Sequence, residues 1–430
     1  AHVVRLQSHS ISDNHLKYRS EEELKQEKLS CPILKLNQYL VSNRICSQDY
    51  LDSLEVELQN EINGAAEWAE QQPDPKKSDV LMHVYSKDSI TPSTEEKAPF
   101  GTELFLIDAI NQALDEEMSL NPDIYVFGQD VAKRKGGVFG ATKGLSEKYG
   151  DSRCFNSPLA ESSIVGVAIG MALQGLKPVV EIQFGDYTWY AMMQLRNEMA
   201  MMRYRSGGEW FCPAVIRIPV GGYIRGASYH SQNIEATFAH FPGLKIVYPS
   251  NASDAKGLLK SAIRGEDPVL FLEHKGLYRQ NYAKGPVGDP SFTVPIGKAK
   301  VLTEGNNATV VTWGALVQKS LLAAKEIEKN GKSIEVIDLR SIVPFDAETV
   351  FKSIQKTSRV LIAHEDVQFM GFGAEISAQI AEHCFPYLDA PIRRVGGKQV
   401  AAIPQAEALE AAALPQDEDV LEALNALLEY

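Results

Sequence analysis

The stretch Asn156-Ser157-Pro158-Leu159-Ala160-Glu161-Ser162-Ser163-Ile164-Val165-Gly166-Val167-Ala168-Ile169 decides the fold of this chain. Its first half has the composition of a loop, and its second half begins a predicted helix over 161–175. Apolar residues surround that helix on nearly every side, and its glycines and alanines let neighbouring elements approach closely. Such a helix is expected at the centre of a domain or at a subunit interface.

The segments on either side of this helix alternate between short apolar strands and helices, in two groups separated by the Pro- and Gly-rich stretch 285–297. The first group has predicted strands 124–127, 178–184, 214–218, 245–248 and 269–272, with helices 103–118, 188–205 and 252–263. The second has predicted strands 309–313, 334–338, 359–363 and 392–395, with helices 315–329, 346–356 and 372–384. This alternation predicts an α/β chain with two parallel-sheet domains, which bind ligands at the carboxyl ends of their strands.

The N-terminal part of the chain has a different character. It is polar, shows helical patterns such as 48–70, and contains no convincing strand. Residues 86–99 are rich in Ser, Thr, Pro, Glu and Lys, which is typical of a linker. We therefore predict a helical segment with its linker at 1–95, a first α/β domain at 96–285 and a second at 286–430.

The composition disfavours several classes of protein. Among 430 residues there are 43 Lys and Arg against 56 Asp and Glu, and the net charge of −13 argues against a nucleic-acid partner. No apolar run reaches the ~20 residues needed to span a bilayer, and no segment looks like a signal peptide. The five cysteines form no C-x-x-C pair, so we expect reduced thiols, an intracellular protein and no metal ligands in this chain. No dinucleotide fingerprint is present, which disfavours an NAD enzyme.

Glu161 is the first candidate functional residue, and it has two interpretations. A carboxylate in the first turn of a helix is stabilised by the helix dipole, which would make Glu161 a simple cap. Alternatively, apolar surroundings raise the pKa of such a carboxyl group and keep it protonated, so that it can donate a hydrogen bond to a ring nitrogen.

Two histidines also stand in motifs that can carry chemistry. His230, in Tyr229-His230-Ser231-Gln232, follows the glycine-rich stretch 221–226 and is placed to form a mobile wall of an active site. His364, in His364-Glu365-Asp366, ends a predicted strand. A lone histidine is more often satisfied by backbone groups, so the sequence leaves the structural alternative open for both.

Taken together and in order, these motifs resemble one family. Residues from about 100 to 430 resemble the β subunit of the 2-oxo acid dehydrogenase E1 component, branched-chain type, in a set of matching stretches. These are Gly128-Gln129-Asp130-Val131, Pro158-Leu159-Ala160-Glu161, Tyr204-Arg205-Ser206-Gly207, Tyr229-His230-Ser231-Gln232, Val336-Ile337-Asp338-Leu339-Arg340 and Gly371-Phe372-Gly373-Ala374-Glu375-Ile376. Residues 1–95 resemble the C-terminal tail of the α subunit of the same enzyme, through Gln7-Ser8-His9-Ser10-Ile11-Ser12-Asp13 and Tyr18-Arg19-Ser20. The resemblance implies an α–β fusion.

The same resemblance implies a fold and a cofactor. The two α/β domains would be a transketolase-like pyrimidine-binding domain and a transketolase C-terminal domain, and the cofactor would be thiamine diphosphate. Glu161 looks like the carboxylic acid that hydrogen-bonds N1′ of the cofactor's aminopyrimidine ring. The residues that would line the ring are Leu159, Gln183 and Tyr187, with Tyr187 stacked on it.

Two histidines match active-site positions of the family. His230 looks like the β-subunit histidine that faces the substrate or the incoming lipoyl group, and His9 looks like the α-tail histidine next to the diphosphate. Gln7 replaces the glycine usual in the family, and Ser8 stands where branched-chain enzymes often have a second histidine. The Gly-Asp-Gly segment and later Asn that hold the diphosphate and Mg²⁺ are expected in the α part that is absent here.

The activity implied by the resemblance is oxidative decarboxylation of a 2-oxo acid with acyl transfer to a lipoyl group. The motifs favour a branched-chain substrate such as 2-oxoisovalerate; the alternatives are a pyruvate enzyme and a non-catalytic half that docks onto E2. The implied partners are the E1 α region and the E2 dihydrolipoyl acyltransferase, in an α2β2-type assembly. The expected location is the bacterial cytoplasm, or the mitochondrial matrix in a eukaryote.

Overall fold

The computed structural model describes residues 3–87 and 99–430. The chain divides into two compact units, 1–80 and 81–430. Most of the predicted linker, 88–98, lies outside the described residues.

The smaller unit is built from three helices, α1 (Glu21–Leu29), α2 (Pro32–Ser42) and α3 (Gln48–Glu70). Serines begin two of them. The Ser20 hydroxyl accepts a hydrogen bond from the backbone N–H of Glu23 at 3.2 Å, and the Ser47 hydroxyl accepts one from Tyr50 at 3.1 Å. No residue of these three helices is buried, so this unit lacks an enclosed core within the described residues.

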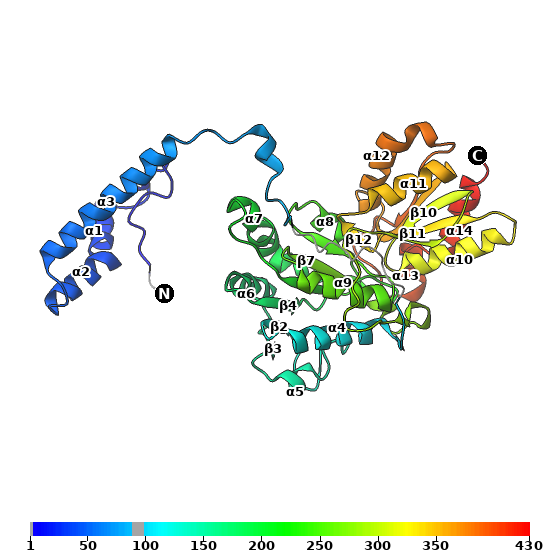
Figure 1. Ribbon diagram of the computed structural model, residues 1–430, viewed down its shortest axis with the longest axis horizontal. Coiled ribbons are helices and arrows are strands. Elements are labelled where there is room, and N and C mark those ends of the chain that lie inside the picture. Colours follow the sequence, from blue (N-terminus) through cyan, green and yellow to red (C-terminus); the bar gives the residue numbers. More distant parts are fainter. Residues whose placement is uncertain (1–2, 88–98) are drawn as a thin grey trace. The chain divides into compact units, whose positions relative to one another are not determined.

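The larger unit contains a seven-stranded sheet in the order β12-β6-β7-β5-β4-β2-β3. Figure 1 labels several of its strands, with α4 (Leu106–Leu120) and α9 (Ala252–Arg264) beside them. All its strands are parallel except β12. The strands are β2 (Ile124–Gly128), β3 (Cys154–Asn156), β4 (Lys177–Glu181), β5 (Val215–Val220), β6 (Lys245–Val247), β7 (Val269–His274) and β12 (Ser341–Val343).

Helices bury both faces of this sheet, as a parallel sheet requires. Neighbouring residues of one strand point to opposite faces: Val179 joins the core formed with α4 and α9, and Val180 joins the core formed with α6 (Glu161–Leu173). Short elements complete the domain: β1 (Glu103–Leu104), β8 (Gly285–Pro286), α5 (Leu145–Tyr149), α7 (Met202–Arg205) and α8 (Glu235–Ala239).

The second sheet has the order β14-β13-β10-β11-β9. Its strands are β9 (Lys300–Thr303), β10 (Ala308–Thr312), β11 (Ile334–Asp338), β13 (Val360–Val367) and β14 (Arg393–Gly397), and only β9 runs antiparallel to its neighbour. The helices are α10 (Leu316–Glu328), α11 (Ala347–Thr357), α12 (Phe372–Cys384), α13 (Glu407–Ala413) and α14 (Asp417–Leu427). Both sheets with their helices confirm the predicted α/β fold, with a helical N-terminal segment.

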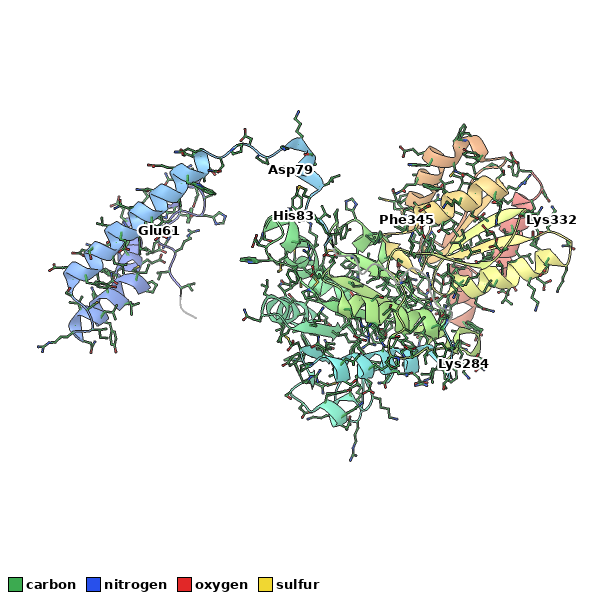
Figure 2. The ribbon with its side chains drawn as sticks, in the orientation of Figure 1. Glu61, Asp79, His83, Lys284, Lys332 and Phe345 are labelled. Carbon is green, nitrogen blue, oxygen red and sulfur yellow. The ribbon has the colours of Figure 1, made fainter. Side chains whose placement is uncertain are left out.

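One continuous core joins the two sheets. It includes Ile216 of the first sheet together with Trp313, Ile337 and Phe372 of the second domain. Side chains fill this region (Figure 2), where Phe345 meets Phe372 edge-on with ring centroids 6.0 Å apart. The strand β12, which follows β11 in the chain, pairs with β6 of the first sheet instead. The second domain thus contributes the edge strand of the first domain's sheet.

One prediction about local structure was wrong, and several short strands were not predicted. The segment predicted as one helix over 188–205 is instead a 3₁₀ turn (Gly185–Ala191), a π-helical stretch (Gln194–Met199) and the short α7. A periodicity of 3.6 residues cannot reveal an i→i+5 hydrogen-bond register, which tertiary packing imposes. The strands β1, β3, β8, β9 and β12 were not predicted, because each has only two to four residues and therefore no visible sequence pattern.

The helix α6 buries only one side in the single chain. Ile164, Val165 and Ala168 are fully enclosed, but Val167 is 49% exposed and Leu173 is 43% exposed. The helix is therefore only partly buried within its domain. Its exposed apolar residues agree better with the predicted position at a subunit interface. Among the described residues, no helix combines the length and the hydropathy needed to cross a bilayer.

Candidate active site

The predicted site residues of the first domain come from loops at the carboxyl ends of its strands. Glu161 stands in the first turn of α6, just after β3 and its loop. Gln183 and Tyr187 follow β4, and His230 follows the 3₁₀ turn Ala227–Tyr229 in the long loop after β5. Because β3, β4 and β5 run parallel, these loops share one edge of the sheet.

Glu161 is a buried carboxyl group with a single protein partner. Its side chain is 8% exposed, and its Oε1 accepts a hydrogen bond from Gln129 Nε2 at 3.2 Å. Among the described residues, Oε2 has no hydrogen-bond partner. Gln183 approaches the same loop, with Nε2 at 3.2 Å from Asp130 Oδ2 and 3.4 Å from the Gln129 carbonyl oxygen.

His230 is held at both ring nitrogens. Nδ1 lies 3.1 Å from the carbonyl oxygen of Gly226, which can only accept, so Nδ1 carries the proton. In the neutral ring Nε2 therefore accepts from the Tyr187 hydroxyl at 3.0 Å. This pair of contacts fixes the tautomer and aims the imidazole, as expected for a histidine that exchanges protons.

Aromatic rings form a wall beside these groups. Phe184 lies between Gln183 and Tyr187 in the chain, and its ring centroid is 4.5 Å from that of His230 and 5.5 Å from that of Tyr187, both edge-on. Burial raises the pKa of the Tyr187 phenol, and the negative charges of Asp186 and Glu161 raise it further. Contacts connect these residues to Glu161, because Glu161 and Gln183 both hydrogen-bond with Gln129 and Gln183 precedes Phe184 in the chain.

Three buried polar groups under this wall lack partners among the described residues: Asp186 Oδ1, Ser231 Oγ and Lys275 Nζ. The Lys275 ammonium lies 5.6 Å from the centroid of the Phe184 ring. Burial lowers the pKa of Lys275 to about 7, although the Glu365 and Asp186 carboxylates oppose this shift. Ser231 belongs to the motif around His230, whereas Asp186 and Lys275 were not predicted, because neither stands in a recognisable motif.

A buried ion network supports the strand ends below the site. The Arg217 guanidinium donates to both oxygens of Glu273 at 2.7 and 2.9 Å, and to Glu181 Oε2 at 2.8 Å. The Tyr278 hydroxyl donates to Glu273 Oε2 at 2.6 Å. Burial raises the pKa of Glu181, while Arg217 opposes that shift. The network ties together β4, β5 and β7, whose loops carry the site.

The structure brings together four of the six predicted residues, namely Glu161, Gln183, Tyr187 and His230. Leu159 stands two residues before Glu161, but its side chain is 83% exposed. His9 belongs to the smaller unit, where its backbone N–H donates to Asp13 Oδ2 at 2.8 Å. The third candidate histidine, His364, lies in β13, stacked on Trp313 with 5.2 Å between centroids, and is not among these four.

No group of three or more metal-ligating side chains is found in the part of the chain that the structure describes. The side chains that line the site are hydrogen-bond donors, hydrogen-bond acceptors and aromatic rings. A buried carboxyl group beside an aromatic wall, with a histidine opposite, can bind a heteroaromatic ring and exchange protons with it.

Three family models match this chain. The model of the transketolase pyrimidine binding domain matches residues 103–281, and that of the transketolase C-terminal domain matches 297–420. The model of the dehydrogenase E1 component matches 1–78.

Curated relatives match most of the chain. The 2-oxoisovalerate dehydrogenase subunit beta of Bacillus subtilis is 48% identical over 324 residues, which cover 75% of this chain and 98% of the relative. The mitochondrial 2-oxoisovalerate dehydrogenase subunit beta of Dictyostelium discoideum is 48% identical over 309 residues, 71% of this chain and 82% of the relative. The pyruvate dehydrogenase E1 component subunit beta of Bacillus subtilis is 42% identical over 328 residues, 76% of this chain and 99% of the relative.

A solved structure titled as a split-gene transketolase, an inactive beta4 tetramer, has a TM-score of 0.60 and 24% sequence identity. It covers 76% of this chain and 98% of its own. This likeness supports the fold.

Proposed function

The chain belongs to the E1 β-subunit family of 2-oxo acid dehydrogenases, and from this premise we propose that it carries the pyrimidine-binding half of a thiamine-diphosphate site that acts on a branched-chain 2-oxo acid. The observation that carries the proposal is the buried Glu161 carboxyl group, with one oxygen held by Gln129 and the other without a protein partner. The family relationship supports the type of reaction, and the contacts in the site indicate which residues take part.

The residues present fit the aminopyrimidine ring of that cofactor. Glu161 offers an oxygen without a protein partner, Oε2, which donates a hydrogen bond to a ring nitrogen when it is protonated. Tyr187 and Phe184 offer aromatic faces, and Gln183 offers an amide at the ring's edge. When bound, thiamine diphosphate supplies the electron sink needed to remove CO₂ from a 2-oxo acid. The divalent metal and the diphosphate are assigned to the α part.

The chain's own residues then have separate tasks. Glu161 is proposed to carry a proton on Oε2, its oxygen without a protein partner, and to share it with the ring nitrogen. His230, aimed by the Gly226 carbonyl and the Tyr187 hydroxyl, exchanges protons with the acyl group or with the lipoyl group that receives it. Leu159 and His9 are assigned by family position: Leu159 to the ring, and His9 to the diphosphate side of the site.

We assign the first 78 residues to the C-terminal tail of an E1 α subunit, so that the chain joins α and β sequence. The support is the match to the dehydrogenase E1 component, placed ahead of a region that spans 98% of a β-subunit relative. The partners proposed with this assignment are the E1 α region, the lipoyl-bearing E2 acyltransferase and a second copy in an α2β2-type assembly.

The substrate assignment is tested by steady-state kinetics of the holoenzyme with 2-oxoisovalerate and with pyruvate. We expect kcat/KM to favour 2-oxoisovalerate by at least about tenfold, because each added methylene in an apolar pocket contributes about 1–3 kcal/mol. The relative at 48% identity supports this choice over the pyruvate enzyme at 42%. Equal constants, or a preference for pyruvate, would assign the chain to the pyruvate type.

The variant His230→Ala should lower acyl transfer to lipoate more than it lowers decarboxylation measured with an artificial electron acceptor. The acceptor bypasses the proton exchange with the lipoyl group, which is the task proposed for His230. The matched variant Tyr187→Phe keeps the aromatic ring and removes the hydroxyl that holds Nε2 at 3.0 Å, so it should show a smaller loss in the same direction. Equal losses in both assays would contradict this role.

A further inference from the structure

A cavity of about 210 Å³ lies between the two α/β domains and is lined by the residues that follow His230 in the chain. Ser231, Gln232 and Asn233 line it from the first domain, and Glu365 and Asp366 line it from β13. Its volume is below the roughly 300–1,000 Å³ of common drug-sized ligand sites, so it suits a small metabolite.

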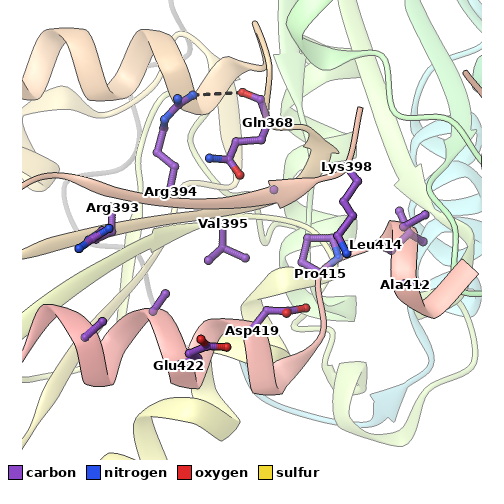
Figure 3. Close-up of a pocket in the computed structure, with 14 residues that line it drawn as sticks. Gln368, Arg393, Arg394, Val395, Lys398, Ala412, Leu414, Pro415, Asp419 and Glu422 are labelled. Carbon is purple, nitrogen blue, oxygen red and sulfur yellow. Dashed lines mark hydrogen bonds between the residues drawn. The ribbon is translucent and has the colours of Figure 1, made fainter. Parts of the chain in front are cut away.

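One wall of this cavity is apolar. The side chains that form it come from the end of β13, the segment after β14 and the residue that follows α13, namely Val367, Val400, Ala401, Ala402, Ile403 and Leu414. Lys398 and Leu414 also line a neighbouring pocket, which is shown in Figure 3. The charged side chains of Arg393, Asp419 and Glu422 line that pocket too. The two residues thus separate an open, charged pocket from the smaller cavity.

Within residues 3–87 and 99–430, the polar groups of the cavity wall include a buried hydroxyl group without a partner and a half-buried carboxylate without a cation. Ser231 is 1% exposed, and among the described residues its hydroxyl has no hydrogen-bond partner. The Asp366 carboxylate accepts from the backbone N–H of Val367 at 2.8 Å and forms no ion pair within the described part of the chain. Burial raises the pKa of Asp366 to about 6, and the Glu365 charge adds to the shift. Native interiors rarely leave such groups unpaired.

The two carboxylates of the cavity are not equivalent. Glu365 already accepts from His274 Nε2 at 2.5 Å and from the backbone N–H of Gly222 at 2.6 Å. Asp366 has no cation of its own, so an ammonium group from a ligand would supply it. Lys398, on the rim, pairs with no carboxylate among the described residues and offers a partner for an anion.

We propose that this cavity is a second small-molecule site that binds a free α-amino acid with a branched apolar side chain, its ammonium group on Asp366, its carboxylate on Lys398 and Ser231, and its side chain against the apolar wall. The ammonium group, the carboxylate and the apolar side chain of such a ligand match the acidic, the basic and the apolar parts of the cavity wall. Neither the thiamine site nor the assigned reaction uses Asp366 or Lys398, so the proposal goes beyond the proposed function.

Binding in this cavity would affect the active site through the chain segment that follows His230. Ser231 and Gln232 follow His230 in the chain, and the backbone N–H of Gln232 lies 3.4 Å from Asp186 Oδ2. A ligand that satisfies the Ser231 hydroxyl reduces the local opening of this segment, because it binds the closed state and not the open one.

Isothermal titration of the full chain with L-leucine tests the proposal, with two single-charge analogues as probes. Leucinamide keeps the ammonium group and lacks the carboxylate, while isocaproate keeps the carboxylate and lacks the ammonium group. We expect one leucine per chain and at least about tenfold weaker binding of each analogue, since each loses one charge-assisted contact. Amide hydrogen exchange of residues 231–233 should slow when leucine is bound.

Two variants locate the site. Asp366→Asn and Lys398→Gln should each weaken leucine binding by at least about tenfold, while Asp389→Asn, an exposed aspartate of the same domain, should bind leucine like the parent chain. Lys398 is exposed, so its variant tests the site even if Asp366→Asn fails to fold. The absence of leucine binding at millimolar concentration, undiminished binding by both variants, or isocaproate binding as tightly as leucine would each overturn the proposal.

Discussion

Replacement of Glu161 with glutamine should lower the turnover of the holoenzyme by about 10²- to 10⁴-fold while the protein remains folded. In the proposed role Glu161 places a proton opposite a ring nitrogen, and a glutamine amide cannot transfer that proton. The change is nearly isosteric, so the hydrogen bond from Gln129 to Oε1 at 3.2 Å can be kept. Steady-state kinetics with an artificial electron acceptor, together with a thermal melt, measure both parts of this expectation.

The competing interpretation, in which Glu161 only caps α6, predicts the reverse pattern. Loss of a first-turn carboxylate would then cost roughly 1 kcal/mol of stability and leave turnover intact. Glu348 offers a matched control, because it stands in the first turn of α11 and is exposed. Glu348→Gln should change neither kcat nor KM, and near-normal activity of Glu161→Gln would remove the central residue of the proposal.

The second large effect is expected in stability. Replacement of Arg217 with methionine should destabilise the larger unit by about 3–5 kcal/mol, because it leaves Glu181 and Glu273 as uncompensated buried charges. Both carboxylates are almost fully enclosed, so water cannot replace the guanidinium. Chemical denaturation followed by tryptophan fluorescence gives the change in the free energy of unfolding.

A triple variant shows whether the loss comes from the unpaired charges. Glu181→Gln and Glu273→Gln, combined with Arg217→Met, remove all three charges and should recover a large part of the lost stability. Lys352→Met, which removes an exposed pair with Glu348, is the control and should leave stability close to that of the parent chain. A loss below about 1 kcal/mol for Arg217→Met would show that the network is not needed to hold the strand ends.

The sequence predicted the fold because its signals are local. Strands such as β10 and β11 are short apolar runs, and helices such as α3 and α9 are periodic, so residues within a few positions of each other carry the information. The motif around Glu161 also belongs to this class, because the loop, the carboxyl group and the apolar helix are contiguous in the chain.

The tertiary structure decided what depends on distant parts of the chain. The Tyr187 hydroxyl meets His230 across 43 positions, β12 joins the sheet of the other domain, and Lys275 is buried beneath Phe184. A hydrogen bond, a strand pairing or a buried charge between remote residues leaves no periodic pattern in the sequence, because its partner can stand at any separation. Folding alone brings these groups together, and the free energy that holds them there comes from packing of the two domains around one core.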